Sequence, residues 1–311
     1  MKIAMVGAGS WARVHLEILT QEAFIEVVGH VHPHPEKLET AIQRWGGRAY
    51  ANCEELLNHE QVDAVWVTVP PGSHGEIEQS LIARRIPFFV EKPLSADRKT
   101  AETISEAIDR AGLIVGVGYH WRAMDTIPLV KEKLAGKSVR MVLAAWHDAT
   151  PPPGWWRRQE TCGGQIVEQA THLFDIARLL VGEARVLAST ASRTDRATYP
   201  DMDVADISAA LLQFDQGAKG VFTATCLLGG PAEIHVQFVC DGLFITITQQ
   251  GALFDYGCEK IEINKGNNPF QTENLAFIKA IQQIDPSLLF SSYADALKTH
   301  HLTHDVFEKS Q

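Results

Sequence analysis

The chain has 311 residues, of which 45% are hydrophobic and 21% charged, and its formal net charge is −10. This composition is typical of a soluble globular protein, and the length predicts about two domains of roughly 100–200 residues each. Nucleic acids and anionic membranes attract basic surfaces, so the acidic balance argues against both as main partners. The sequence contains no apolar run of the ~18 residues that a membrane-spanning helix needs.

Strand-like and helix-like segments alternate through the first 120 residues. Strands are predicted at 2–6, 25–31, 64–69, 88–90 and 113–119, and helices at 11–20, 36–45, 73–84 and 96–111. The strands are continuously apolar, which is typical of parallel strands covered on both faces. Residues 1–120 are therefore predicted to form an α/β domain of the Rossmann type, with a doubly wound parallel sheet.

The pattern changes after residue 120. A helix is predicted at 125–135, a strand at 139–147 and a helix at 165–181; strand-like stretches between turn signals then fill 184–263, and helices follow at 273–283 and 293–307. Residues 121–311 are therefore predicted to form an α+β domain with a large, open, mostly antiparallel sheet. We expect its exposed face to hold a homo-oligomer together, as a dimer or tetramer.

The cysteines and the first residues bear on location. The five cysteines show no CxxC spacing, and an odd number of scattered cysteines indicates reduced thiols. The opening MKIAMVGAGS lacks the long apolar core and cleavage site of a signal peptide. We therefore expect a cytoplasmic protein.

A glycine-rich loop, GAGSWA, directly follows the first predicted strand. Gly7, Gly9 and Ala12 stand in G-x-G-x-x-A spacing, in which the glycines allow a tight turn and close approach of a pyrophosphate. The helix that starts at Ser10 and Trp11 offers free N–H groups and its dipole to that anion. A glycine turn can be purely structural, but its place in the first of several βαβ units favours dinucleotide binding.

The second predicted strand is not followed by an acidic residue. His32 stands where dinucleotide-binding proteins place the Asp or Glu that binds the adenosine ribose. Because that carboxylate repels a 2′-phosphate, its absence weakens the case for strict NAD preference. His32, His34 and Lys37 are equally consistent with a phosphate contact and with a solvated turn. A metal site is a weaker third interpretation, because the neighbouring prolines are rigid and no cysteine joins the group.

Five segments together resemble the Gfo/Idh/MocA oxidoreductase family over nearly the whole chain. They are GAGSWARVH at 7–15, TVPPGSHGEI at 68–77, EKPLS at 91–95, VGYHWR at 117–122 and GGQIVEQATHLFDIARLL at 163–180. The resemblance implies a Rossmann domain followed by an open-sheet domain. It also implies oxidation or reduction of a sugar, cyclitol or related polyol with NAD or NADP.

The resemblance also assigns roles to residues. The lysine of the family's EKP motif falls on Lys92. The resemblance implies that Lys92 takes part in substrate binding and proton transfer, and that its bond to Pro93 is cis. Glu91 then lies near the nicotinamide ribose, and Pro70 and His74 lie by the cofactor.

The family's active-site histidine falls on His172. Glu168 stands where the family usually has Asp, and Gln165 where a third glycine is common. Asp175 is expected to be a structural anchor.

These residue types suit hydride transfer. Oxidation of an alcohol needs a base for the hydroxyl proton, and His and Lys both serve near neutral pH. Glu168 and His172, four residues apart, are expected to share one face of a helix. There Glu168 holds the imidazole tautomer or binds a substrate hydroxyl. The alternative interpretations of this pair are an exposed ion pair and a metal site. The context of Lys92 and the glycine loop favours polyol redox chemistry over both, and we predict no metal.

Four further residues complete the expected pocket and its surroundings. His120 and Arg122 end the last strand of the first domain, where such sheets bind ligands. Trp156 is expected to contact the substrate, and Trp155 to pack in its loop or an interface. The segment THHLTH at 299–304 is expected to be a solvated helix face.

The sequence thus predicts an NAD(P)-dependent oxidoreductase acting on CH–OH groups of a small polyol or sugar. A non-catalytic dinucleotide-sensing regulator is one alternative. An NAD-dependent hydrolase or isomerase that oxidises its substrate transiently is another. The presence of Lys92 and His172 favours catalysis over sensing.

Overall fold

The computed structural model describes the backbone of residues 1–311 and every side chain except that of Pro35. The chain divides into two compact units. Unit 1 comprises Met1–Ser95, Lys99–His120 and Pro269–Leu297; unit 2 comprises Ala96–Arg98, Trp121–Asn268 and Lys298–Gln311. The segment Pro269–Leu297 thus belongs with the N-terminal unit, whereas a single boundary after residue 120 assigns it to the second domain.

Unit 1 is built on a six-stranded parallel sheet with the strand order β3-β2-β1-β4-β5-β6. Its strands are β1 (Lys2–Val6), β2 (Glu26–Val31), β3 (Arg48–Tyr50), β4 (Ala64–Val67), β5 (Phe88–Val90) and β6 (Val115–Val117). The order reverses between β1 and β4, and doubly wound sheets bind ligands at the carboxyl ends of the strands beside such a reversal. The predicted Rossmann-type sheet is confirmed.

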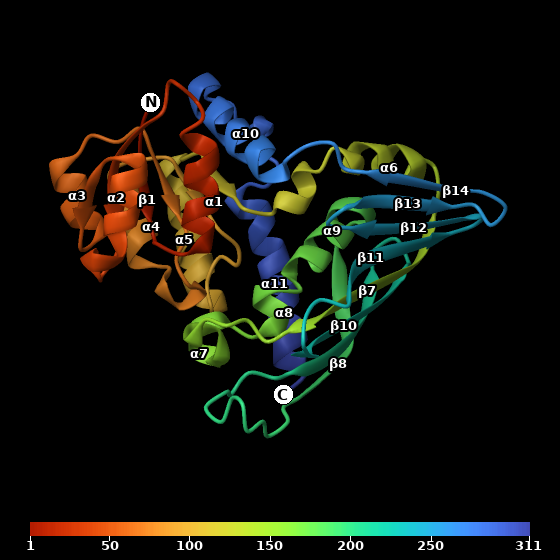
Figure 1. Cartoon of the computed structure of the whole chain (residues 1–311). Helices are drawn as coiled ribbons and strands as arrows, with labels where there is room; N and C mark the ends of the chain where they lie inside the picture. Colours follow the sequence, from red (N-terminus) through yellow and green to blue (C-terminus); the bar gives the residue numbers. More distant parts are fainter. The chain divides into compact units, whose positions relative to one another are not determined.

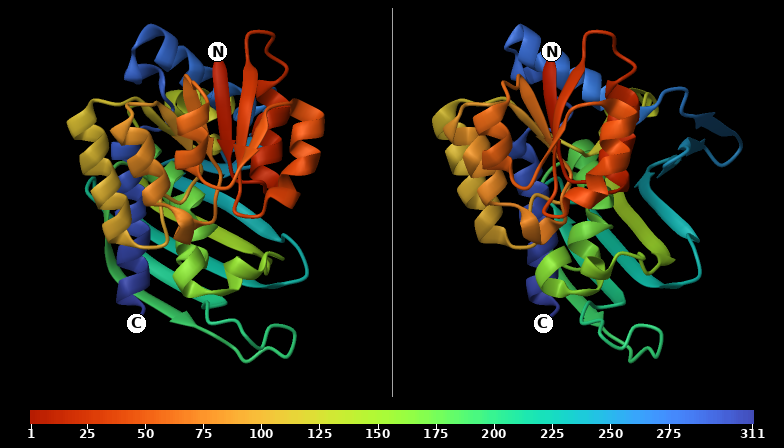
Figure 2. Two further views of the ribbon diagram at one scale, coloured as in Figure 1. Left: turned by 90° about the vertical axis from the view of Figure 1, so that its left-hand side faces the viewer. Right: turned by 60° about the vertical axis from the view of Figure 1, so that its left-hand side comes forward.

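Helices cover both faces of this sheet (Figures 1 and 2). They are α1 (Ser10–Leu19), α2 (Glu39–Trp45), α3 (Cys53–His59), α4 (Glu76–Ala83), α5 (Arg98–Ala111), α10 (Pro269–Gln283) and the start of α11 (Tyr293–Lys309), with 3-10 turns η1 (Pro35–Leu38), η2 (Pro71–Ser73) and η5 (Pro286–Leu288). Successive residues of β4 enter different cores, with Val65 in one and Trp66 in the other. This double burial explains the continuously apolar strands.

Two elements of unit 1 lack a sequence pattern strong enough to predict. The strand β3 has only three residues, and α3 is a seven-residue helix whose start is capped by the side chain of Asn52. The sequence pattern of helix α10 also does not show that this helix belongs to unit 1. It joins this unit because Phe277 packs against the rings of Trp66 and Phe89, at 5.3 and 5.7 Å between centroids.

Unit 2 is built on an eight-stranded sheet with the order β14-β13-β12-β11-β7-β10-β9-β8, antiparallel except between β7 and β10. Its strands are β7 (Val139–Ala149), β8 (Ala184–Ser192), β9 (Ile207–Phe214), β10 (Lys219–Leu228), β11 (Glu233–Cys240), β12 (Leu243–Thr248), β13 (Gly251–Asp255) and β14 (Lys260–Asn264). This confirms the predicted large, mostly antiparallel sheet.

One face of this sheet is covered by helices, as Figure 1 shows for α8 and α9. The helical elements of the unit are η3 (His120–Ala123), α6 (Thr126–Leu134), η4 (Gly154–Arg157), α7 (Gln159–Cys162), α8 (Gln165–Glu168), α9 (Thr171–Val181) and the end of α11. Alternate strand residues such as Phe222 and Leu212 enter the core beneath the helices. The residues between them, including Leu211 and Val221, are exposed on the open face.

The C-terminal histidine segment is buried, which corrects the expectation of a solvated face. His300 and His304 are 1% and 5% exposed, and Nε2 of His300 lies 3.3 Å from the carbonyl oxygen of Asp97. Leu302 and Val306, on the opposite side of α11, enter the core of unit 2. Burial lowers the pKa of His300 well below its usual value and that of His304 to about 4. Both imidazoles are therefore neutral at neutral pH.

Two expectations from the sequence concern covalent links and membranes. All five cysteines are free, and only Cys258 is exposed. Among the described residues, no helix combines the length and the apolar character needed to cross a bilayer.

Candidate functional site

The glycine loop joins β1 to α1 in unit 1. Gly7 has a φ of +110°, and a Cβ atom there would lie 2.5 Å from the carbonyl oxygen of Thr68. Any other residue at position 7 would therefore force β1 and β4 apart. At Gly9 the opposite holds, since nothing lies within 4 Å of its Cβ position. Ala12 is buried in the core between α1 and the sheet, as its small size suggests.

The first turn of α1 is open to an anion. Gly9 occupies the N-cap without a side-chain hydrogen bond, and the first turn holds no acidic residue. Ser10 and Trp11 are exposed. Uncapped N–H groups and the positive end of the helix dipole both favour a phosphate at this place. The loop thus fits the pyrophosphate of a dinucleotide by its shape and by its donors.

His32 follows β2 in a turn that also holds Lys37 and Glu36, and Oε1 of Glu36 lies 3.5 Å from Nδ1 of His34. Its Nδ1 accepts a hydrogen bond of 2.9 Å from the backbone N–H of His34. Burial, then the nearby charges of Lys37 and His34, lower the pKa of His32. Among the described side chains, no group of three or more His, Cys, Asp or Glu residues is placed to hold a metal ion.

His74 is directed at a glutamate. Its Nδ1 lies 2.6 Å from Oε1 of Glu78, and Oε2 of Glu78 accepts a 2.6 Å hydrogen bond from the N–H of Gly75. Burial alone would raise the pKa of Glu78, but the charge and hydrogen bonds of these two partners lower it. The imidazole of His74 is thus held by α4, next to the turn that Pro70 begins.

Lys92 lies just after β5, at the edge where parallel sheets bind ligands. Its bond to Pro93 is cis, as the family resemblance implies. Glu91 is 5% exposed, and its Oε1 lies 2.8 Å from Nε2 of His15. The other oxygen, Oε2, accepts a 3.2 Å hydrogen bond from the backbone N–H of Lys92. The structure therefore joins the predicted residues 91 and 92 to His15, which the sequence did not single out.

His120 joins an aromatic cluster at the start of α1. Its ring stacks on Phe270 at 4.2 Å between centroids, and Trp11 lies 6.4 Å away. Trp11 itself lies 5.4 Å from Phe270. The structure thus brings two predicted residues, one expected at the cofactor and one at the substrate, to the same place beside the glycine loop.

The predicted helix at 165–181 is two helices, which corrects the expected arrangement of Glu168 and His172. The helix α8 ends at Glu168 and α9 begins at Thr171. Between them the N–H of Ala170 bonds back to the carbonyl of Gln165, a span of five residues instead of four. Glu168 and His172 therefore do not lie one regular turn apart on a shared face.

Trp156 is buried, and its predicted contact with the substrate stays a prediction. It is 1% exposed and packs in a cluster with Cys162 and Met202. Its Nε1 donates a 2.7 Å hydrogen bond to Oε2 of Glu168. Trp156 thus orients the carboxylate of Glu168 and presents no free ring face.

His172 is 3% exposed and lies among indole rings. The ring centroids of Trp121 and Trp146 lie 6.2 and 6.0 Å from the imidazole. Trp121 was not predicted as a site residue, although it lies in the quoted segment VGYHWR. The signal available was its position next to His120, at the end of a predicted strand.

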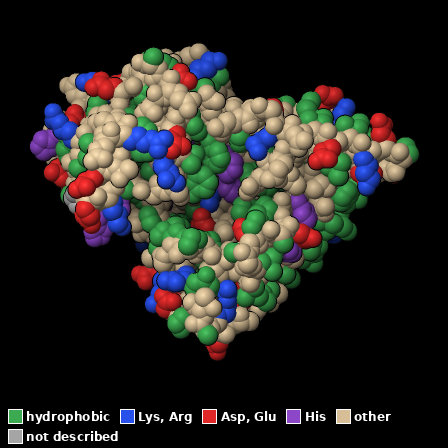
Figure 3. All heavy atoms as spheres, viewed as in Figure 1, with side chains coloured by type: hydrophobic (Ala, Val, Ile, Leu, Met, Phe, Trp, Pro, Cys, Tyr) green, Lys and Arg blue, Asp and Glu red, His purple; other side chains and the backbone are tan. Residues whose placement is uncertain are grey.

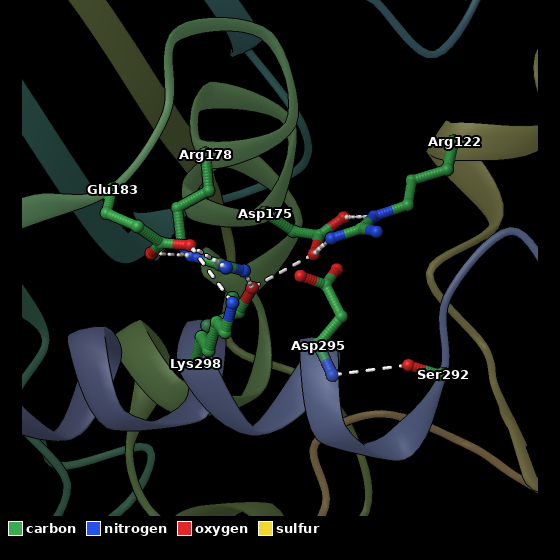
Figure 4. A network of polar contacts seen from close by, with 8 residues as sticks. Arg122, Asp175, Arg178, Glu183, Ser292, Asp295 and Lys298 are labelled. Carbon is green, nitrogen blue, oxygen red and sulfur yellow. Dashed lines mark hydrogen bonds and ion pairs between the residues drawn. The ribbon is translucent and has the colours of Figure 1, made fainter. Parts of the chain in front are cut away.

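Arg122 is paired with a carboxylate, and its predicted place in the substrate pocket stays a prediction. Its Nε and Nη2 donate to the two oxygens of Asp175 at 2.6 and 2.5 Å, and both side chains are buried (Figure 4). Asp175 also accepts from the hydroxyl of Thr299, which accepts in turn from Arg178. Arg178 is paired with Glu183. This chain of contacts gives Asp175 the anchoring position expected of it.

The fold and the glycine loop are those of a dinucleotide-binding protein. Residues 1–119 match a family model described as "Oxidoreductase family, NAD-binding Rossmann fold", and residues 129–243 match one described as "GFO/IDH/MocA C-terminal domain". The chain belongs to the Gfo/Idh/MocA family. It is accordingly an NAD(P)-dependent oxidoreductase.

Similar proteins carry more specific names. A myo-inositol 2-dehydrogenase from Thermotoga maritima is 27% identical over 229 residues, which cover 71% of this chain and 67% of the relative. The solved WlbA dehydrogenase from Bordetella pertussis, in complex with NADH and UDP-GlcNAcA, has a TM-score of 0.86 at 20% identity, covering 100% and 96% of the two chains. A 3-ketoreductase from Actinomadura kijaniata, in complex with NADP and TDP-benzene, has a TM-score of 0.88 at 18% identity, covering 99% and 97%. The two solved structures support the fold.

Proposed function

We propose that the enzyme transfers a hydride between nicotinamide and a sugar-, cyclitol- or polyol-like substrate, with Lys92 and His172 as its acid–base groups. The observation that carries the proposal is the place of Lys92 after β5, in a sheet whose open glycine loop fits a dinucleotide. The inositol dehydrogenase among the relatives supports the substrate class.

The residues of the chain divide the work between binding and proton transfer. Bound nicotinamide accepts or supplies the hydride. When the alcohol is oxidised, the hydroxyl proton passes to Lys92 or His172; when the carbonyl is reduced, the same group returns it. Glu168, oriented by the indole N–H of Trp156, is proposed to accept a hydrogen bond from a second substrate hydroxyl.

The proposed cofactor contacts lie in unit 1. Gly7, Gly9, Ser10, Trp11 and Ala12 form the loop and helix start for the pyrophosphate. Near the adenosine end, His32 stands in place of the carboxylate that would repel a 2′-phosphate, and Lys37 follows in the same turn. We therefore propose that NADP binds more tightly than NAD.

A fluorescence titration with NADPH and NADH tests the cofactor part of this proposal, and a polyol panel with the preferred cofactor tests the substrate part. We expect saturable binding of both dinucleotides, a lower Kd for NADPH, and turnover of at least one sugar or cyclitol. Failure to bind either dinucleotide would contradict the assigned cofactor site. Binding without turnover across hexoses, inositols and their keto forms would contradict the substrate class.

We further propose that the open face of the unit 2 sheet pairs with a second copy of the chain. Leu211, Val221 and Leu143 are registered neighbours across β9, β10 and β7 and form an uncharged row. Figure 3 shows apolar side chains gathered along the lower right edge of the picture, over the strands of this unit. On the open face, Val221 is 39% exposed. A flat face that displays the same apolar row in every copy suits a two-fold symmetric contact.

Light scattering coupled to size-exclusion chromatography tests this contact. The wild-type protein is expected to elute with at least twice the 34.4 kDa of one chain, and Val221→Glu to elute as a monomer because it buries like charges against each other. The matched control is Lys131→Glu, which adds a carboxylate at an exposed position of α6, outside the sheet. A monomeric wild-type protein would contradict the proposal.

A further inference from the structure

A buried hydrogen-bond network in unit 1 fixes the protonation of His15. The indole Nε1 of Trp66 can only donate, so the atom it contacts at 2.6 Å is the amide oxygen of Asn274. The NH₂ group of Asn274 therefore donates to the carbonyl of Phe270 at 2.6 Å and is assigned as the donor to Nδ1 of His15, which lies 2.9 Å from this nitrogen and 3.2 Å from the amide oxygen. Because Nδ1 accepts, the imidazole proton lies on Nε2.

This tautomer makes His15 a donor to Glu91. Its Nε2 lies 2.8 Å from Oε1 of Glu91, and the backbone N–H of Lys92 donates to Oε2. Two donors aimed at two oxygens form the arrangement that a carboxylate requires. Glu91 is also confined, since a Cβ at Gly118 would lie 2.8–2.9 Å from its carboxylate atoms.

Glu273, the neighbour of Asn274 on α10, lies in a different environment. It is 2% exposed, and neither of its carboxylate oxygens has a hydrogen-bond partner among the described residues. An ionised carboxylate in such a place would lose its hydration without compensation, whereas a neutral acid loses far less. Burial, and then the charge of Glu91, raise the pKa of Glu273 well above its ordinary value.

We propose that Glu91 and Glu273 act as a buried carboxyl pair that holds one negative charge on Glu91 and one proton on Glu273, and that this pair positions the peptide of Lys92. Glu273 is then a positioning residue: its proton prevents a second negative charge from pushing Glu91 away from the N–H of Lys92. The effect on turnover rests on the proposed function, but the charge state of the pair does not.

The pH dependence of unfolding tests the charge state. In the unfolded chain Glu273 titrates at its ordinary pKa of about 4.3. In the folded chain the pKa is raised, so the stability from this group is complete at low pH and is lost as the pH rises toward the folded value. Glu273→Gln keeps the shape and does not titrate. Between the ordinary pKa and the raised pKa of the folded chain, the unfolding constant of the wild type relative to this variant should therefore rise about tenfold per pH unit.

The control substitution is Glu39→Gln, which removes an exposed carboxylate of unit 1. Relative to this variant, the unfolding constant of the wild type should not change with pH over the same range. Equal pH slopes for wild type and Glu273→Gln would show that Glu273 is ionised in the folded protein and would overturn the proposal.

A second measurement needs only the wild-type protein. At pH 7 exposed carboxyl groups are ionised, so an infrared carbonyl band of a protonated carboxylic acid reports a buried acid. We expect such a band in the wild type and its loss in Glu273→Gln; its absence from the wild type would also overturn the charge assignment.

The positioning role predicts a change in the pH profile of kcat. Glu273→Gln should match the wild type at neutral pH and retain turnover at alkaline pH where the wild type declines. Identical alkaline limbs would overturn the positioning role. Because unfolding and infrared data do not depend on turnover, a failure of the proposed function would not be mistaken for a failure of the pair.

Discussion

Replacement of Lys92 by alanine is expected to abolish measurable turnover, with a loss in kcat of at least about 10²–10⁴-fold, the range that a positioned acid–base group contributes. Dinucleotide affinity should stay nearly unchanged. The pyrophosphate is proposed to bind the glycine loop and the first turn of α1, and neither is built from Lys92. Steady-state kinetics on a substrate from the polyol panel measures the first effect, and NAD(P)H fluorescence titration measures the second.

Lys99→Ala is the matched control for this substitution. Lys99 is an exposed lysine seven positions further along the chain, in the first turn of α5, so the same charge is removed from the same unit. Its kcat and its dinucleotide Kd should both match those of the wild type. Full activity of Lys92→Ala would contradict the proposed mechanism. A joint loss of turnover and dinucleotide binding would instead place Lys92 in the cofactor site.

Replacement of Asp175 by alanine is expected to lower the free energy of unfolding by about 3–5 kcal/mol, as measured by urea denaturation. The stability is lost because the substitution leaves Arg122 without its buried carboxylate partner. Arg122 is 6% exposed, and without Asp175 its guanidinium would keep its charge in the interior without the carboxylate that both of its donors contact. The hydroxyl of Thr299 would lose its acceptor as well.

A surface ion pair provides the comparison. Arg110 lies 3.5 Å from Glu106 on α5, and both side chains are 70% exposed. Arg110→Ala should change the free energy of unfolding by no more than about 0.5 kcal/mol, because water screens the pair and solvates the remaining charge. A similarly small loss for Asp175→Ala would mean that the contacts in Figure 4 do not anchor α9.

The sequence predicts well those features that each arise from a short stretch of chain. Continuously apolar strands indicate a parallel sheet because residues such as Val65 and Trp66 enter opposite cores. The glycine spacing can be recognised in the sequence because position 7 has no room for a side chain, so a glycine must stand there. Lys92 is found by its motif, and its place after β5 follows from the strand that precedes it.

The sequence does not show the contacts that Arg122 and Trp156 make, or the interruption before α9. Arg122 was expected in a pocket, but its carboxylate partner lies 53 residues away, at Asp175. Trp156 was expected to meet a sugar, but its N–H is used by Glu168 and its rings by an apolar cluster. The interruption before α9 contains neither proline nor glycine, so the helical pattern at 165–181 gives no sign of it.

The return of α10 to unit 1 has a consequence for how the protein is made. Asn274 sets the tautomer of His15, and Phe277 covers Trp66 and Phe89, yet both residues are synthesised some 150 residues after the last strand of that sheet. Chains grow at about 5–20 residues per second and domains fold as they emerge. The core of unit 1 that holds Trp66 and Phe89 therefore stays uncovered during synthesis until almost the whole chain has been translated. A chain cut after residue 120 would lack that cover permanently and would expose the rings of Trp66 and Phe89.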